Sequence, residues 1–193
     1  MDNKTKILII GASSYVGARL YFDLKSKFAV VGTYSANPLS KSFVHLDIKN
    51  EEEVEKVVNN TRPDVIIHVA NNASAKWCDA NPKEAVLLNQ TATQYIVDST
   101  NKVNAKLIYT STMGAIKPSN LYGKTKLKSE EIVKTTKNGY LILRPSLILG
   151  YGPNTTNDRP FNRLLKNLDE GVPAVYDTSW KFQPTYIRHI SEV

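Results

Sequence analysis

Apolar, β-branched runs alternate with amphipathic stretches along most of the chain. The runs are short and continuous, which is typical of strands that are buried on both faces. The stretches between them are long enough to form helices that return to the same sheet edge. This pattern predicts an α/β fold with a parallel, doubly wound sheet of the Rossmann type. Strands are expected at 6–10, 28–33, 64–69, 105–110 and 140–143, and helices at 15–25, 51–60, 82–101 and 121–137.

Composition and charge narrow the class of protein. The 193 residues are 41% hydrophobic and include a single cysteine, Cys78, which excludes an internal disulfide and a multi-cysteine zinc site. The first apolar run, 7–10, is too short for a signal peptide or a membrane span. We therefore expect a cytoplasmic protein that does not enter a membrane.

The net charge of +7 is concentrated in the second half of the chain, since the first 100 residues have equal numbers of basic and acidic side chains. One interpretation is attraction of an anionic ligand such as a nucleotide phosphate, and the alternative is a generic basic surface. No basic stripe with interleaved aromatic residues and no nucleic-acid-binding module is present, so a nucleic-acid partner is not expected.

A glycine-containing turn joins the first strand to the first helix. It reads Gly11-Ala12-Ser13-Ser14-Tyr15-Val16-Gly17. The first glycine allows a sharp turn, the last allows the helix to pack close to the sheet, and the amides between them face a pyrophosphate. The alternative is a tight turn without a ligand. In this context the turn predicts a dinucleotide-binding site.

The end of the second strand bears on the choice of dinucleotide. NAD-preferring sites have an acidic residue there for the ribose 2′-hydroxyl. Here the strand runs into Thr33, Tyr34 and Ser35, followed by Ala36 and Asn37, with Lys41 nearby. A 2′-phosphate would meet no repulsion, so we expect NADP(H) to be favoured over NAD(H), although the arginine typical of NADP sites is also absent.

The pair Tyr122 and Lys126 carries the predicted chemistry. Residues four apart on a helix share one face, so the two side chains are expected to lie together. A nearby ammonium favours the phenolate and lowers the pKa of a tyrosine, which otherwise titrates near ~10. The phenol can then act as an acid in a reduction or a base in an oxidation. A surface tyrosine and a solvated lysine are the alternative.

The glycine turn and the stretch Asn120-Leu121-Tyr122-Gly123-Lys124-Thr125-Lys126-Leu127 resemble extended short-chain dehydrogenases/reductases, and most closely dTDP-4-dehydrorhamnose reductases. They also resemble the related regulatory subunit of methionine adenosyltransferase. The resemblance covers the whole chain. It implies domain boundaries at 1–150, an NAD(P)-binding Rossmann domain, and 151–193, the start of a truncated substrate-binding region. A loop is expected at 151–160 and a helix at 161–170. The last residues look like the start of another helix, so we expect the chain to be a fragment or to lack its C-terminal lobe.

The resemblance also implies roles for individual residues. Thr112 is the expected catalytic hydroxyl, with Ser111 beside it as the alternative, and strand-end capping is a structural explanation for both. Asp47 contacts the adenine or, alternatively, caps the helix that begins near Glu51. Asn89 steadies the loops around the nicotinamide, unless it is an exposed helical residue. The expected cofactor-binding set is Gly11, Ser13, Ser14, Tyr15, Val16, Gly17, Ser35, Asp47, Ile48, Ala70, Asn71, Asn72, Asn89, Thr110, Ser111, Tyr122 and Lys126.

Some positions depart from the family pattern. Ser14 replaces the middle glycine of the turn, where it either donates to a phosphate or weakens its binding. Met113 and Gly114 stand where 4,6-dehydratases carry acidic residues, which argues against dehydration. The segment from Thr112 to Tyr122 is short, so the substrate pocket is reshaped.

His68 is expected to be a core histidine. Turn 143–146 is expected under the nicotinamide, or is simply a strand ended by a proline.

Two functions follow from these residues. The first is an NADP(H)-dependent reductase or epimerase that acts on a nucleotide-linked sugar, with Tyr122, Lys126 and Thr112 as its catalytic residues. The second is a non-catalytic, NADP-binding regulatory module. A homodimer is left open.

Overall fold

The computed structural model describes residues 4–153, 160–173 and 183–193. Its centre is a six-stranded parallel sheet in the order β3-β2-β1-β4-β5-β6. This is the strand order of the Rossmann fold, and it confirms the predicted fold class. The strands are β1 (Lys6–Ile10), β2 (Ala29–Tyr34), β3 (Val44–His45), β4 (Val65–His68), β5 (Lys106–Thr110) and β6 (Tyr140–Leu143).

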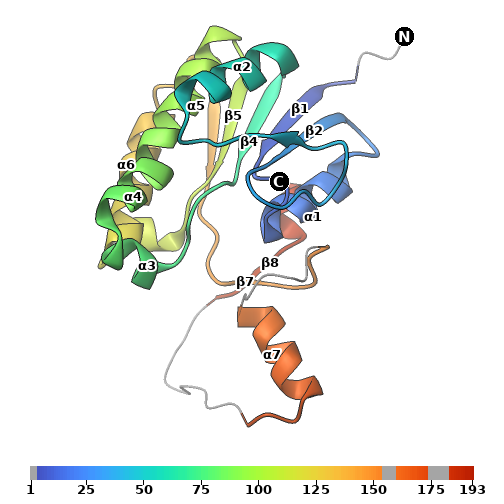
Figure 1. Cartoon of the computed structure of the whole chain (residues 1–193), viewed down its shortest axis with the longest axis vertical. Helices are drawn as coiled ribbons and strands as arrows, with labels where there is room; N and C mark the ends of the chain where they lie inside the picture. The colour runs from blue at the N-terminus through green and yellow to red at the C-terminus, as the bar shows by residue number, and fades with distance from the viewer. Residues whose placement is uncertain (1–3, 154–159, 174–182) are drawn as a thin grey trace.

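Helices lie on both faces of this sheet (Figure 1). One face is covered by α2, α5 and α6, and α1 packs on the other together with the C-terminal helix α8. The helices are α1 (Tyr15–Leu24), α2 (Glu51–Thr61), α3 (Ala75–Ala80), α4 (Pro82–Val86), α5 (Ala92–Lys102), α6 (Leu121–Val133), α7 (Pro160–Asp169) and α8 (His189–Glu192).

The core has two parts, one on each face of the sheet. Side chains such as Leu8 and Ile66 point toward α2 and α5, while Ile9 and Ile67 point toward α1. Successive residues of a strand alternate between faces, and these four side chains are at most 4% exposed. The continuous apolar runs in the sequence are therefore the direct result of a sheet that is covered on both sides.

The predicted long helix at 82–101 contains an irregular turn. The structure begins it as α4, passes through a π-helical segment at Leu87–Thr91, and continues as α5. Such turns insert one extra residue into a helix and are frequent at functional sites. This one turns Asn89 into the protein interior, where it is 1% exposed. An exposed helical asparagine, the alternative considered for this residue, is therefore wrong.

A second, two-stranded sheet follows the main one. It pairs β7 (Ile148–Leu149) with β8 (Thr185–Tyr186), and neither strand was predicted from the sequence. The helix expected at 161–170 is α7, which lies beside this small sheet at the end of the molecule (Figure 1). Part of the loop expected at 151–160 lies outside the described residues. The helix expected at the end of the chain is α8, whose Ile190 packs into the core on the α1 face.

Candidate active site

The turn between β1 and α1 has the predicted geometry. Gly11 has a φ of +92°, a conformation that favours glycine, and its amide donates to Thr33 Oγ1 at 3.0 Å. A Cβ on Gly17 would lie 2.2 Å from the carbonyl oxygen of Gly11. The two glycines therefore let α1 begin directly against the end of β1. This contact leaves the N-terminus of α1 beside the crevice at the carboxyl edge of the sheet.

Ser14, which replaces the middle glycine, is the N-cap of α1. Its hydroxyl oxygen accepts the Gly17 amide at 3.1 Å, as serine commonly does at this position. The neighbouring Ser13 accepts the Leu39 amide at 3.1 Å and ties the turn to the loop after β2. Both serines thus support the turn from within. The side chain of Tyr15 is buried and donates to the Gly150 carbonyl, so any contact it makes with a ligand in the crevice involves its backbone.

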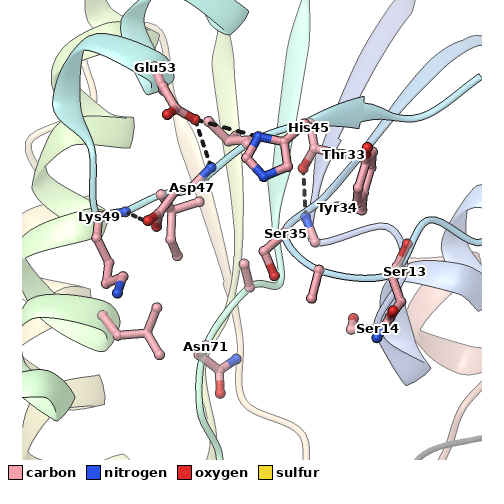
Figure 2. Close-up of a pocket in the computed structure, with 17 residues that line it drawn as sticks. Ser13, Ser14, Thr33, Tyr34, Ser35, His45, Asp47, Lys49, Glu53 and Asn71 are labelled. Atoms are coloured by element: carbon pink, nitrogen blue, oxygen red, sulfur yellow. Dashed lines mark hydrogen bonds and ion pairs between the residues drawn. The ribbon is translucent and has the colours of Figure 1, made fainter.

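A pocket of about 810 Å³ opens beside this turn (Figure 2). Its walls come from the ends of β1, β2, β3 and β4. Of the expected cofactor-binding residues, the lining contains Gly11, Ser13, Ser14, Ser35, Asp47, Ile48, Ala70 and Asn71. The lining also contains Thr33 and Tyr34, at the strand end considered for the ribose, and residues that sequence reasoning missed: His45, Leu46, Glu53 and Leu88. The lysine of this lining is Lys49, and Lys41, which we had placed nearby, is not part of it.

Asp47 lies on one wall of the pocket, opposite the serines of the glycine turn (Figure 2). It does not cap α2, because Asn50 is the N-cap and accepts the Glu53 amide at 3.2 Å. The Asp47 carboxylate instead accepts the Lys49 amide at 3.0 Å, while Glu53 accepts the Asp47 amide at 3.0 Å. The alternative of a capping role is therefore wrong, and the carboxylate is held at the pocket wall.

Asn89 supports the loop that follows β4. Its side-chain oxygen accepts the Asn72 amide at 2.8 Å, and its side-chain nitrogen donates to the Asn72 carbonyl at 3.0 Å. Ser129 of α6 donates to the Asn89 carbonyl at 2.6 Å. Neither Asn72 nor Asn89 lines the pocket, so their contribution to it is indirect. Together they connect the β4 loop, the π-helical turn and α6.

Lys126 is the buried cation of the site. It is 1% exposed, and its Nζ donates to the Thr110 carbonyl at 2.7 Å and lies 4.1 Å from the centre of the Tyr109 ring. Burial lowers the pKa of Lys126 to about 7, and the nearby Glu130 carboxylate acts in the opposite direction. The alternative of a solvated lysine is wrong. At neutral pH this ammonium is therefore close to its titration point.

Tyr122 lies one turn before Lys126 on α6, whose first turn is fixed by Asn120. The Asn120 side chain accepts the Gly123 amide at 2.9 Å, so the helix begins immediately before the tyrosine. Gly123 allows the short preceding segment to pack closely, because a Cβ there would lie 2.6 Å from the Gly114 carbonyl. Tyr122 is partly buried. The phenol is therefore neither enclosed in the core nor fully in solvent.

The hydroxyls of Ser111 and Thr112 differ in their partners. Ser111 is buried and donates to the Glu130 carboxylate. Thr112, partly buried, accepts the Gly114 amide at 3.2 Å and so caps a short 3-10 turn at Met113–Ala115. An accepting bond leaves the threonine proton available for a further partner. Strand-end capping thus applies to Thr112, and the structure assigns Ser111 a different partner.

His68 is a core residue, as predicted from the sequence. It is 1% exposed, and burial lowers its pKa to about 3, so its ring is neutral. Its Nε2 lies 3.3 Å from the Thr93 hydroxyl, which itself donates to the Asn89 carbonyl. Glu130, which binds Ser111 and Arg144, was not predicted as a site residue, whereas Arg144 belongs to the turn expected at 143–146. The signal for Glu130 in the sequence was the spacing Tyr122, Lys126, Glu130, which continues one helical face.

The fold and this site define a Rossmann-type protein of the extended short-chain dehydrogenase/reductase class. Residues 5–193 match the model of the RmlD substrate binding domain, and the chain belongs to that family. It is 31% identical over 164 residues to dTDP-4-dehydrorhamnose reductase of Salmonella typhimurium, covering 77% of this chain and 53% of that protein.

A second relative is the methionine adenosyltransferase 2 subunit beta of Xenopus tropicalis, at 30% identity over 97% of this chain and 60% of the relative. Among solved structures, dTDP-4-dehydrorhamnose reductase of Bacillus anthracis in complex with NADP superposes with a TM-score of 0.78 at 22% identity, over 98% of this chain and 68% of that one. This last likeness supports the fold. The chain spans between half and two thirds of the length of these curated relatives. No helix in the described part of the chain is both long and apolar enough to cross a membrane.

Proposed function

We propose that this chain binds NADP(H) and carries the proton-transfer residues of an oxidoreductase that acts on the keto group of a nucleotide-linked sugar. The observation that carries the proposal is the buried Lys126 ammonium one helical turn from Tyr122, at the same sheet edge as the 810 Å³ pocket. A buried lysine with a strongly lowered pKa at such an edge is typical of an active site.

The residues of the pocket fit a dinucleotide. The N-terminus of a ten-residue helix and the serines of the glycine turn lie at one end, where a pyrophosphate would bind. A Cβ on Gly11 would lie only 2.9 Å from Ala70, so the chain segments after β1 and β4 approach each other closely. This close approach forms a narrow floor for the cofactor. At the other end, Asp47 and Ile48 provide an acceptor and an apolar surface for an adenine.

NADP(H) is preferred to NAD(H) in this proposal. Thr33, Tyr34 and Ser35 form the part of the lining at the end of β2, where a ribose 2′-hydroxyl would bind, and none of them is acidic. Lys49, whose Nζ lies 3.9 Å from Glu84 Oε2, adds a cation to the lining beside Asp47 (Figure 2). A 2′-phosphate therefore finds hydroxyl donors at the end of β2, while the carboxylates of the lining, Asp47 and Glu53, come from the segment after β3 and from α2. The relative from Bacillus anthracis was solved with NADP, which agrees with this preference.

The proposed chemistry is a reduction with Tyr122 as the acid. The nicotinamide, when bound, supplies the hydride to the carbonyl carbon. Tyr122 donates its phenolic proton to the carbonyl oxygen, and the Lys126 ammonium stabilises the phenolate that remains. Thr112 donates a hydrogen bond to the same oxygen while charge develops on it. Run in reverse, Tyr122 is the base that removes the proton of an alcohol.

The substrate class comes from the relatives rather than from the pocket. Several are dTDP-4-dehydrorhamnose reductases, whose name specifies a keto group on a sugar linked to a nucleotide. The missing acidic residues after Thr112 argue for reduction or epimerisation rather than dehydration. The second candidate is a non-catalytic, NADP-binding regulatory module. It is favoured by the 97% coverage of this chain in the match to the methionine adenosyltransferase subunit.

The test is turnover in the chain with and without its phenol. NADPH oxidation is measured with a 4-keto nucleotide sugar for the wild type, Tyr122→Phe and Tyr140→Phe. Tyr140 is the control because it is 46% exposed at the start of β6. We expect Tyr122→Phe to lower turnover about 10²- to 10⁴-fold with NADPH affinity retained. Full activity in Tyr122→Phe would refute the mechanism. NADPH binding without turnover in the wild type would favour the regulatory module.

A further inference from the structure

Glu130 is a buried carboxylate two turns after Tyr122 on α6. Its side chain is fully shielded from solvent, and its partners come from two other elements. Ser111, after β5, donates to Oε1. Arg144, after β6, donates through Nε to Oε1 at 2.9 Å and through Nη2 to Oε2 at 2.6 Å. One carboxylate thus binds three donors and links α6 to the ends of β5 and β6.

The backbone connects the same two strand ends. The Ser111 amide donates to the Leu143 carbonyl at 2.7 Å, and the Met113 amide donates to the Pro145 carbonyl at 3.1 Å. These bonds flank Thr112, which leaves the sheet between them. The backbone conformation of Thr112 is extended, with φ −156° and ψ 152°. The position of its hydroxyl therefore depends on how the ends of β5 and β6 are held against α6.

The energetics indicate a role in geometry more than in stability. Burial alone would raise the pKa of Glu130, but the hydrogen bonds from Arg144 and Ser111 outweigh it and keep that pKa below its ordinary value. The carboxylate is therefore charged at neutral pH. A buried ion pair is often no more stabilising than an apolar replacement, because removing both charges from water is costly. The bidentate Arg144 contact instead fixes the orientation of the Glu130 side chain, because a planar guanidinium that makes two parallel hydrogen bonds to a carboxylate allows one arrangement.

We propose that Glu130 is a positioning residue that holds Thr112 in register with the Tyr122 and Lys126 pair by tying the ends of β5 and β6 to α6. The assignment of Thr112, Tyr122 and Lys126 rests on the function proposed above. Glu130 also accepts the hydroxyl proton of Ser111 in a hydrogen bond. Of the two hydroxyls that follow β5, this leaves that of Thr112 able to turn its proton toward a substrate oxygen.

The test compares two neighbouring carboxylates on α6. Glu130→Gln keeps the size of the side chain but cannot accept from all three donors. Glu131→Gln removes an exposed carboxylate whose described partner is Lys128 at 2.9 Å. Amide hydrogen exchange is followed at Ser111 and Met113, with the central strand β1 as an internal reference. NADPH affinity and turnover are measured on the same samples.

In Glu130→Gln we expect exchange at Ser111 and Met113 to accelerate about tenfold or more relative to β1, with no such change in Glu131→Gln. Turnover should fall about 10- to 100-fold, while the dissociation constant for NADPH changes less than about threefold. Ser111→Ala keeps the ion pair between Glu130 and Arg144. It should also accelerate exchange at these amides and lower turnover, by smaller factors, and it replaces Glu130→Gln in the test if that variant does not fold.

Unchanged exchange at Ser111 and Met113, or a loss of protection that is equal throughout the sheet, would overturn the proposal. So would an unaltered turnover number beside a large loss of NADPH affinity. The exchange measurement needs no substrate. It therefore distinguishes failure of the positioning role from failure of the proposed reaction, which Tyr122→Phe tests.

Discussion

Two regions at the carboxyl edge of the sheet are built differently. The end beside β2 and β3 is a pocket of about 810 Å³ whose side chains mainly support its loops, as Ser13 and Ser14 do by accepting backbone amides. The end beside β5 and α6 contains buried polar side chains: Lys126 donates to the Thr110 carbonyl, and Glu130 binds Ser111 and Arg144. One end provides space, and the other provides fixed charges.

This difference matches what each end is proposed to do. A nucleotide needs room and close approach to the backbone, which glycine and small residues allow. Proton transfer needs side chains with fixed positions and shifted pKa values, which burial and hydrogen bonding create. If the comparison is right, substitutions at the two ends should affect different properties of the protein. Those at the β5 end should change turnover or the pH dependence of stability, and those at the β1 turn should change packing and dinucleotide affinity.

After Tyr122→Phe, the largest expected effect is at the two hydroxyls that follow β5. Thr112→Ala should lower turnover about 10²- to 10³-fold, because it removes the proposed donor to the developing negative charge. Ser111→Ala should lower turnover less than Thr112→Ala, since the Ser111 hydroxyl is bound to Glu130. Steady-state rates with NADPH and a 4-keto nucleotide sugar measure both. A greater loss in Ser111→Ala would reverse the assignment of the catalytic hydroxyl.

The next effect is a pH dependence of stability caused by Lys126. Its folded-state pKa of about 7 lies below the ordinary lysine value of 10.5, so folding disfavours its charged form. The cost to the wild type is small above pH 10.5, grows as the pH falls toward 7, and is complete below 7. Relative to Lys126→Met, the wild type should therefore lose about 2–4 kcal/mol of unfolding free energy between pH 10 and pH 6.

Urea denaturation of both proteins across this pH range measures the difference. Lys124→Met, which removes an exposed lysine from the same helix turn, controls for the loss of a positive charge. Parallel pH profiles for the wild type and Lys126→Met would mean that the buried ammonium is not destabilised as described.

The smallest effect concerns the glycine turn. In Gly17→Ala the new methyl group would meet the Gly11 carbonyl at 2.2 Å, which the backbone must relieve by moving. We expect a loss of about 1–3 kcal/mol in unfolding free energy and weaker NADPH binding. Gly114→Ala is the matched control, because its methyl group would lie 3.7 Å from the nearest described atoms. Similar stability and affinity in both variants would show that close packing of α1 is not required.

The main sheet could be predicted from the sequence because its strands are buried on both faces. Lys6–Ile10 and Tyr140–Leu143 occur with the predicted bounds, since continuous apolar runs leave little ambiguity. Val44–His45 and Ile148–Leu149 were missed. Strands of two residues are determined by the partner they pair with, not by their own pattern.

The site was predicted in part for a similar reason. The glycine turn and the Tyr122 and Lys126 spacing are local patterns, so they can be read along the chain. The π-helical turn at Asn89 and the Glu130 contacts depend on which segments meet in three dimensions. A carboxylate on a helix is usually in solvent, and only the packing of β5 and β6 against α6 buries this one.

The most direct test of the account is a crystal structure of the chain with NADPH. We predict the adenine against Asp47 and Ile48, the pyrophosphate at the start of α1, and the nicotinamide ring within contact distance of the Tyr122 phenol. A dinucleotide bound elsewhere, or one whose nicotinamide lies away from a phenol that points into bulk water, would contradict the central claim that one crevice joins the pocket to the proton-transfer pair.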